Sequence, residues 1–289
     1  MSKPDLTNCP KVLQNGDVRW VMASLSLPML LSSLGTSIAN VALPALVHSF
    51  AASFQAVQWV VLAYLLAITS TIVGVGRLGD VIGRRRLLLV GIVVFSVASV
   101  LCGAASGLGW LIAARALQGI GAAIMMALTM ALVGEAVPKE RTGSAMGLLG
   151  TMSAVGTAVG PTFGGVLIAV GGWQAIFLIM FPLGVAALLL ALRLLPTDTP
   201  STGAPRPPFD KAGLVVLAMA LAAYALAMTL GKGHFGVING ALLLASIGGG
   251  ALFLWVEARA PAPLVRPGLF RQGTLGAGFA MSALVTAVV

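Results

Sequence analysis

Apolar segments of membrane-spanning length recur along this chain, and they limit its fold more than any other feature. A helix needs about 20 mostly apolar residues to cross the hydrocarbon core of a bilayer. Eight segments meet this requirement: Trp20–Val47, Val57–Val75, Leu87–Ala105, Leu108–Val133, Ser144–Val170, Ala175–Leu195, Ala212–Leu230 and Val237–Val256. A ninth begins near Leu275, and the sequence ends within it at Val289. The pattern predicts an all-α, polytopic transmembrane helical bundle with about nine spans.

The composition argues against a soluble protein and against an enzyme. Only 9% of the 289 residues are charged, whereas a soluble domain typically has about a quarter. Cys9 and Cys102 are far apart and predict neither a disulfide framework nor a metal site. The sequence has no phosphate-binding loop of the form G-x-x-x-x-G-K-[ST] and no plausible Ser/His/Asp or Cys/His arrangement. We therefore expect no catalytic activity, no cofactor and no metal.

The basic residues lie almost entirely on one side of the predicted spans. Of the 17 Lys and Arg residues, all but Lys232 and Arg115 fall in the N-terminal segment and in the gaps that share its side. Because cytoplasmic loops are enriched in Lys and Arg, this asymmetry predicts a cytoplasmic N-terminus. The eight acidic residues lie in or beside the same segments. The basic residues form no continuous face, which argues against nucleic acid as a partner.

The segment after the second span has the most specific sequence, G-R-L-G-D-V-I-G-R-R-R over residues 76–86. The glycines Gly76 and Gly83 permit a tight reversal between two helices. Asp80 is placed to accept hydrogen bonds from the first amides of the third span. Arg84, Arg85 and Arg86 would face the anionic lipid headgroups of the inner leaflet. An ordinary positively charged loop would explain the arginines, but it would not explain the ordered Gly, Asp and Gly spacing.

Arg115 is the only charged residue deep within a span. A charge at this depth is costly, so we expect Arg115 to face a cavity or a polar partner rather than lipid. Gln118 follows three positions later and therefore lies on the same helical face. The alternative is that Arg115 extends to the membrane surface, since it lies about seven residues from the outer end of its span.

The fifth predicted span carries glycines at four-residue spacing, Gly156, Gly160 and Gly164. Such a stripe permits close contact between helices. Pro161 removes a backbone hydrogen bond and predicts a bend. Together with Gly165, these residues suggest a hinge, and simple packing is the alternative.

Several of these motifs resemble those of one transporter family, the major facilitator superfamily. The segment 76–86 looks like the signature loop between its second and third helices, 111–121 is similar to its helix-four motif, and 156–165 resembles its antiporter motif in helix five. The segments 38–44 and 58–64, and the extra helix pair after residue 211, look like the 14-span drug:proton antiporter branch. The resemblance implies a major facilitator fold, about five further spans, and hence a chain truncated at its C-terminus. It also implies a cytoplasmic latch at Gly76, Asp80, Gly83, Arg84 and Arg85, and a role for Arg115 in proton coupling.

One position departs from the pattern of that branch. Its helix-one motif usually carries an acid where this sequence has Gly35. A proton-coupled antiporter needs a group that titrates as the site alternates, ordinarily a carboxylate in a cavity of low dielectric. Either this carboxylate lies outside the 289 residues, or coupling uses another group.

The resemblance predicts proton-coupled efflux of hydrophobic or cationic small molecules by a monomer in the bacterial inner membrane. The expected parts are a six-span half at 1–195, a Pro-rich linker at 196–211, a two-span hairpin at 212–257, and a loop with the start of a further span at 258–289. Candidate cavity residues share a polar, aromatic or polarisable character; they are Asn40, Trp59, Tyr64, Met125 and Met126. An exporter of one metabolite, such as an amino acid or sugar, and a non-transporting membrane subunit or fragment are the alternatives.

Overall fold

The described parts of the chain consist of helices and contain no strand. The computed structural model describes residues 15–196, 211–229 and 236–259. The predicted ninth span lies outside these ranges. The helices are α1 (Asn15–Phe50), α2 (Phe54–Ile82), α3 (Arg84–Gly103), α4 (Leu108–Ala136), α5 (Lys139–Leu178), α6 (Met180–Leu194), α7 (Lys211–Thr229) and α8 (Val237–Arg259).

The predicted apolar segments that the structure describes are helical, and several of the helices extend beyond them. Six of the described helices are long and apolar enough to cross a membrane, and apolar helices of 10–17 residues occupy Met180–Leu194 and Val215–Ala227. α2 continues beyond the predicted end of its span at Val75 to Ile82, because a helix does not have to stop where its sequence becomes polar. The all-α transmembrane architecture is therefore confirmed.

The predicted boundary between the fifth and sixth spans lies within α5. α5, from Lys139 to Leu178, consists of two helices joined at a kink, where Gly172 has non-helical backbone angles, with φ 71° and ψ −179°. Glycine tolerates this left-handed φ because it has no Cβ. The chain therefore changes direction within the predicted gap, and α6 is short because the preceding turns are counted with α5.

The helix α4 packs between α2 and α3, and two glycines allow the close approach. A Cβ placed on Gly119 would lie 2.5 Å from the carbonyl oxygen of Tyr64 in α2. A Cβ on Gly121 would lie 2.6 Å from the backbone nitrogen of Phe95 in α3. Since real Cβ atoms do not approach other atoms so closely, larger residues at these positions would push the helices apart.

The predicted glycine stripe of α5 lies against α1, with which α5 makes its most extensive contact. A Cβ on Gly156 would lie 2.7 Å from the carbonyl oxygen of Leu30, and one on Gly160 would collide with Ser37. The hydroxyl of Ser37 also bonds the carbonyl oxygen of Gly156 at 3.2 Å. These contacts make the stripe a tight seam between the two helices.

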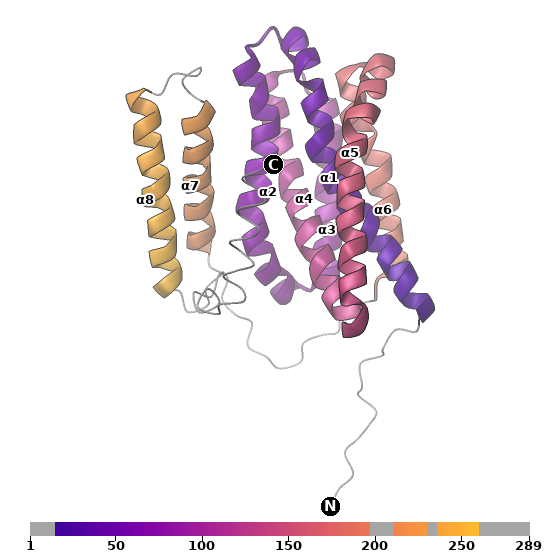
Figure 1. The fold of residues 1–289 in the computed structure, drawn as a ribbon. Helices are drawn as coiled ribbons and strands as arrows, with labels where there is room; N and C mark the ends of the chain where they lie inside the picture. Colours follow the sequence, from indigo (N-terminus) through magenta and orange to yellow (C-terminus); the bar gives the residue numbers. More distant parts are fainter. Residues whose placement is uncertain (1–14, 197–210, 230–235, 260–289) are drawn as a thin grey trace, which may run out of the picture.

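The helices α7 and α8 form a separate pair beside α2, drawn in orange and yellow in Figure 1. The side-chain amide nitrogen of Asn239 in α8, Nδ2, donates to the carbonyl oxygen of Ala227 in α7 at 2.6 Å. Large apolar side chains such as Leu244 and Ile247 are exposed on the surface of this pair. An apolar surface of this kind is suited to contact with lipid.

Candidate functional site

The predicted loop at 76–86 is almost entirely helical. α2 runs to Ile82 and α3 begins at Arg84, so a single residue separates them. This residue, Gly83, has φ 106° and ψ 129°, a backbone conformation that other residues rarely adopt. Gly76 instead lies within α2, where a Cβ would meet nothing within 4 Å. The prediction that both glycines form the reversal was therefore wrong for Gly76 and right for Gly83.

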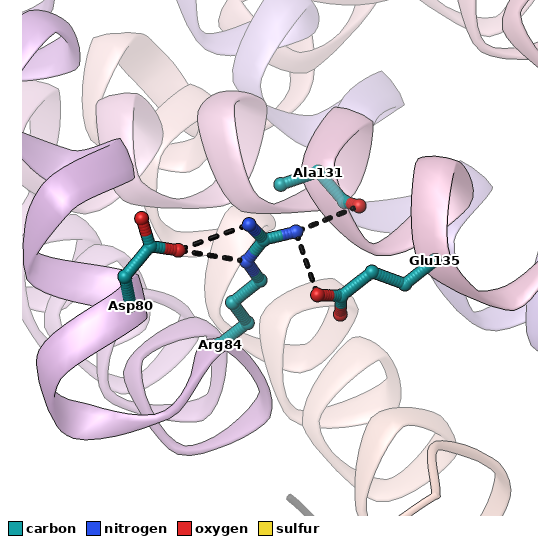
Figure 2. Close-up of polar contacts among 4 residues, drawn as sticks. All are labelled: Asp80, Arg84, Ala131 and Glu135. Carbon is teal, nitrogen blue, oxygen red and sulfur yellow. Dashed lines mark hydrogen bonds and ion pairs between the residues drawn. The ribbon is translucent and has the colours of Figure 1, made fainter. Parts of the chain in front are cut away.

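The side chain of Arg84 lies between two carboxylates, as Figure 2 shows. Its Nη2 donates to Asp80 Oδ1 at 2.9 Å, and its Nε donates to the same oxygen at 3.2 Å. Its Nη1 approaches Glu135 Oε1 at 2.9 Å and also donates to the carbonyl oxygen of Ala131 at 3.3 Å. We call Asp80, Arg84 and Glu135 the basic-end cluster, because they lie at the end of the bundle that carries most of the arginines.

Asp80 does not cap α3, contrary to the prediction. The N-cap of α3 is Gly83, and no side chain bonds there. Asp80 lies in the last turn of α2, four residues before Arg84, and its carboxylate turns to the guanidinium. An ion pair with an arginine satisfies a carboxylate better than neutral amides do, which explains the difference.

Glu135 belongs to none of the sequence motifs. It lies in the last turn of α4, more than fifty residues after Asp80 in the sequence, and only the packing of α2 on α4 brings the two together. The sequence nevertheless contains one indication that Glu135 could pair with an arginine. It is an acid at the end of a span, on the side where the arginines gather. An acid there has several cationic partners within reach.

Water reaches the basic-end cluster. The exposed fractions of the side chains are 28% for Arg84, 48% for Asp80 and 57% for Glu135. Ion pairs in contact with water contribute about 0.2–1 kcal/mol each. They therefore hold α2, α3 and α4 in register and can still exchange partners at little cost.

Arg85 extends the same junction toward α6. Its Nη2 donates to the carbonyl oxygen of Leu192 at 2.8 Å. Leu192 lies in the last turn of α6, where carbonyl groups lack partners within the helix and a cation is favourable. The turn at Gly83 is thus connected to the ends of both α4 and α6.

Arg115 is completely buried, in agreement with the prediction that it avoids lipid. Its Nε donates to the carbonyl oxygen of Val60 at 3.0 Å, and its Nη2 donates to that of Gly35 at 3.1 Å. Its Nη1 donates to Gln118 Oε1 at 2.6 Å. The guanidinium also lies 4.0 Å from the centre of the Tyr64 ring, a favourable cation–π distance. We call Arg115, Gln118 and Tyr64, with these two carbonyl groups, the buried arginine cluster.

Gln118 connects this cluster to α3. Its Nε2 donates to Ser99 Oγ at 2.7 Å, while its Oε1 accepts from Arg115. Both polar ends of the amide are therefore used. The prediction that Gln118 shares a helical face with Arg115 is correct, and the amide joins α4 to α3 through it.

Tyr64 occupies the space next to Gly35. Its hydroxyl donates to the carbonyl oxygen of Ser32 at 2.8 Å. A Cβ placed on Gly35 would lie 2.9 Å from this hydroxyl oxygen. At position 35, α1 therefore offers a backbone carbonyl to Arg115, and a tyrosine fills the room that a side chain would need.

The other predicted residues have different surroundings. Met125 is fully buried, like Tyr64, so neither lines an open cavity in this conformation. Trp59 and Met126 are partly buried, and Asn40 is exposed on α1. Pro161 lies within α5, and the sharp change of direction is at Gly172 instead. A Cβ on Gly165 would meet nothing within 4 Å, so this glycine is not part of the seam with α1.

The comparison with family models decides the family. The model of the Major Facilitator Superfamily matches residues 25–289. The chain belongs to the Major Facilitator Superfamily. Membership in this family and the apolar helices make it a multi-pass membrane protein of a transporter fold.

Among the relatives of this superfamily member are transporters with different stated roles. It is 35% identical over 211 residues to the riboflavin transporter RibZ of Clostridioides difficile, covering 73% of this chain and 46% of that protein. It is 35% identical over 242 residues to the multidrug resistance protein Stp of Mycobacterium tuberculosis, and this match covers 83% of this chain and 44% of that protein. It is 33% identical over 266 residues to the putative multidrug resistance protein MdtD of Citrobacter koseri, covering 91% and 56%. The chain thus spans about half the length of these curated relatives.

Solved structures show the same fold. A bacterial homologue of the human lysosomal transporter Spinster, in an inward-facing and occupied conformation, aligns with a TM-score of 0.56. The alignment covers 89% of this chain and 65% of that one, at 20% sequence identity. At this identity the likeness extends to the arrangement of the helices.

Proposed function

We propose that this chain forms part of a secondary active transporter that exports hydrophobic small molecules in exchange for protons, by alternating access. In this proposal residues 1–195 are one six-span half, 196–211 a cytoplasmic linker, 212–257 an additional helix pair, and 258–289 a loop leading into a further span. The protein acts as a monomer in a bacterial inner membrane with its N-terminus in the cytoplasm. Family membership and relatives described as multidrug resistance proteins support this reading.

The observation that carries the proposal is the basic-end cluster. A transporter that alternates must hold one end closed and then release it, which requires contacts that break at little cost. The Asp80–Arg84–Glu135 contacts are suited to this, because they are ionic, exposed to water and located where three helices end. We assign them, with Gly83 and Arg85, the role of a cytoplasmic latch.

The buried arginine cluster and the α1–α5 seam take other roles in this proposal. Arg115 joins α4 to α1 and α2 and transmits movement among them, with Gln118 extending the connection to α3. The part of α5 that carries Gly156, Gly160 and Gly164 moves as one body with α1. Pro161 allows α5 to bend locally. The partly buried or exposed Trp59, Met126 and Asn40 are the residues we assign to the substrate path.

A second candidate function is export of one specific metabolite. The observation in its favour is that a relative at 35% identity is described as a riboflavin transporter. The two readings differ in breadth, since a multidrug exporter accepts several unrelated aromatic compounds and a metabolite exporter accepts one.

The test uses inside-out membrane vesicles from cells that produce the chain. Imposing a pH gradient, acidic inside, should drive uptake of a hydrophobic fluorescent dye, and a protonophore should abolish it. The Asp80→Asn variant should reach the membrane in equal amount and take up the dye more slowly. Uptake equal to that of vesicles lacking the chain would refute transport, and unchanged uptake by Asp80→Asn would refute the latch. Uptake of riboflavin but of no unrelated dye would favour the metabolite reading.

A further inference from the structure

The buried arginine cluster holds a full positive charge among neutral groups. The hydrogen-bond partners of Arg115 are two backbone carbonyl oxygens and the amide oxygen of Gln118. The titratable side chains beside it are Tyr64 in α2 and Cys102 in α3. Dipoles and an aromatic face can satisfy the donors of a guanidinium, but they leave its net charge in place.

The three carboxylates whose side chains the structure describes, those of Asp80, Glu135 and Glu140, are too distant to neutralise this charge. Glu135 lies on the same helix as Arg115, twenty residues further on, which corresponds to about 30 Å along α4. Asp80 lies in the last turn of α2, and Glu140 in the first turn of α5, at that same end of the bundle. These three carboxylates therefore lie at the basic end, about a membrane thickness away from Arg115.

Tyr64 also prevents α1 from supplying a carboxylate. The hydroxyl oxygen of Tyr64 stands 2.9 Å from where a Cβ of Gly35 would be. Any acid at position 35 would therefore displace the tyrosine that covers the guanidinium. Among the described side chains, Arg115 therefore has no carboxylate partner, and position 35 has no room for one while Tyr64 keeps its place.

In the proposed function, solutes move along the exposed face of α4, where the charge of Arg115 acts on them. An α-helix with its side chains is about 10 Å across, so a solute moving along the exposed face of α4 passes within roughly 10 Å of the guanidinium. At an effective dielectric constant of about 20, two unit charges at that separation change a binding constant on the order of tenfold. Arginines at the basic end have a weaker effect at this depth, because water and salt screen them.

We infer that these helices act as an electrostatic filter that favours organic anions over organic cations of the same shape. This inference rests on the proposed function and names the substrate class of the same path: amphipathic aromatic anions. It narrows the expectation of hydrophobic or cationic substrates, because a cation would approach the Arg115 charge, beside which the described side chains place no carboxylate.

The test measures binding, so that it does not depend on transport. The purified chain, in nanodiscs of an uncharged lipid mixture, is titrated with fluorescein and with a cationic rhodamine, which share a xanthene core and carry opposite charges. Binding is followed by fluorescence polarisation, and the signal of empty nanodiscs is subtracted. The anion should bind at least about tenfold more tightly than the cation. Equal affinities, tighter binding of the cation, or no saturable binding of either dye would overturn the inference.

Two variants alter the charge in different ways. Arg115→Gln removes it, and Gln118→Glu places a carboxylate beside the guanidinium, where Nη1 and Oε1 are 2.6 Å apart. Either change should bring the anion-to-cation ratio of binding constants close to one. Gln118→Glu keeps the arginine and its carbonyl contacts, so it remains informative if Arg115→Gln fails to fold. The matched control is Arg193→Gln, which removes one exposed charge at the end of α6 and should leave the ratio unchanged.

The outcomes separate this inference from the proposed function. A persistent binding ratio with no pH-driven uptake in vesicles would refute transport and leave the filter intact. Uptake of the cationic dye that exceeds uptake of the anionic one, with no binding preference, would refute the filter and leave transport intact. If Arg193→Gln lowers the anion-to-cation ratio of binding constants as much as Gln118→Glu does, the preference comes from surface charge. That result would also refute the filter.

Discussion

Arg84 and Arg115 both connect helices, but their surroundings are opposite. Arg84 is 28% exposed and is flanked by two carboxylates. Arg115 is completely buried and is held by carbonyl oxygens, an amide and an aromatic ring. Both therefore satisfy their donors, and only Arg84 has its charge balanced by neighbouring side chains.

The difference follows from access to water. At the basic end, water can replace either carboxylate when an ion pair opens, so the contacts are weak and exchangeable. Around Arg115 no water competes, and any lost contact leaves a buried polar group without a partner, which is expensive. The first arrangement is suited to a latch, and the second to a permanent connection.

Arg115→Ala should lower the free energy of unfolding by about 2–5 kcal/mol, because it leaves a cavity and removes the donor from three buried acceptors. Arg84→Ala should lower it by less than about 1 kcal/mol. Both values are measured by denaturant unfolding of the purified protein. Arg115→Met restores most of the volume without the charge and should recover part of the loss. A larger effect at Arg84 than at Arg115 would contradict the contrast.

Gly83→Ala should destabilise the protein by about 1–2 kcal/mol, because alanine strains the φ of 106°. The same change at Gly76, where a Cβ meets nothing, should be neutral or stabilising by up to about 1 kcal/mol. The pair is compared by thermal unfolding. Equal losses at both positions would mean that the turn does not depend on the conformation of Gly83.

Tyr64→Phe should cost about 0.5–1.5 kcal/mol, because it removes one buried hydrogen bond to Ser32 and retains the ring over Arg115. Tyr64→Leu serves as the control that removes the ring as well, and it should cost more. A similar loss for both variants would indicate that the aromatic face contributes nothing to holding the guanidinium.

Asp80→Asn should change stability least, by about 0.2–1 kcal/mol. Raising the salt concentration from about 0.05 to 0.5 M should diminish this difference, because exposed ion pairs are screened. The effect of Arg115→Met, measured in the same series, should be nearly independent of salt. A salt-independent loss at Asp80 would show that its ion pair is not the exchangeable contact described here.

The sequence was sufficient to predict the all-α membrane fold and the burial of Arg115. Long apolar segments and the high cost of a charge in lipid leave few alternatives. It was not sufficient to predict the partners of Arg115, because the carbonyl groups of Gly35 and Val60 belong to the backbone and leave no signature in the side chains.

The basic-end cluster was predicted only in part. Polar residues after Val75 suggested a loop, whereas the helix continues to Ile82 and directs Asp80 toward Arg84. Glu135 joins the cluster through the packing of α4 on α2, a contact between distant segments that no local pattern encodes. Within the described residues, hydropathy therefore indicated where the apolar helices lie and underestimated the lengths of several of them.

The single-residue turn at Gly83 has a mechanical consequence. Because Gly83 alone separates α2 from α3, there is no flexible loop to absorb a rotation or a shift of either helix. A rotation at the end of α2 must reach the start of α3 at once, and the guanidinium groups of Arg84 and Arg85 must swing with it, relative to α4 and α6. The turn therefore couples rotation of α2 to movement of both arginine side chains, and Gly83 is the hinge.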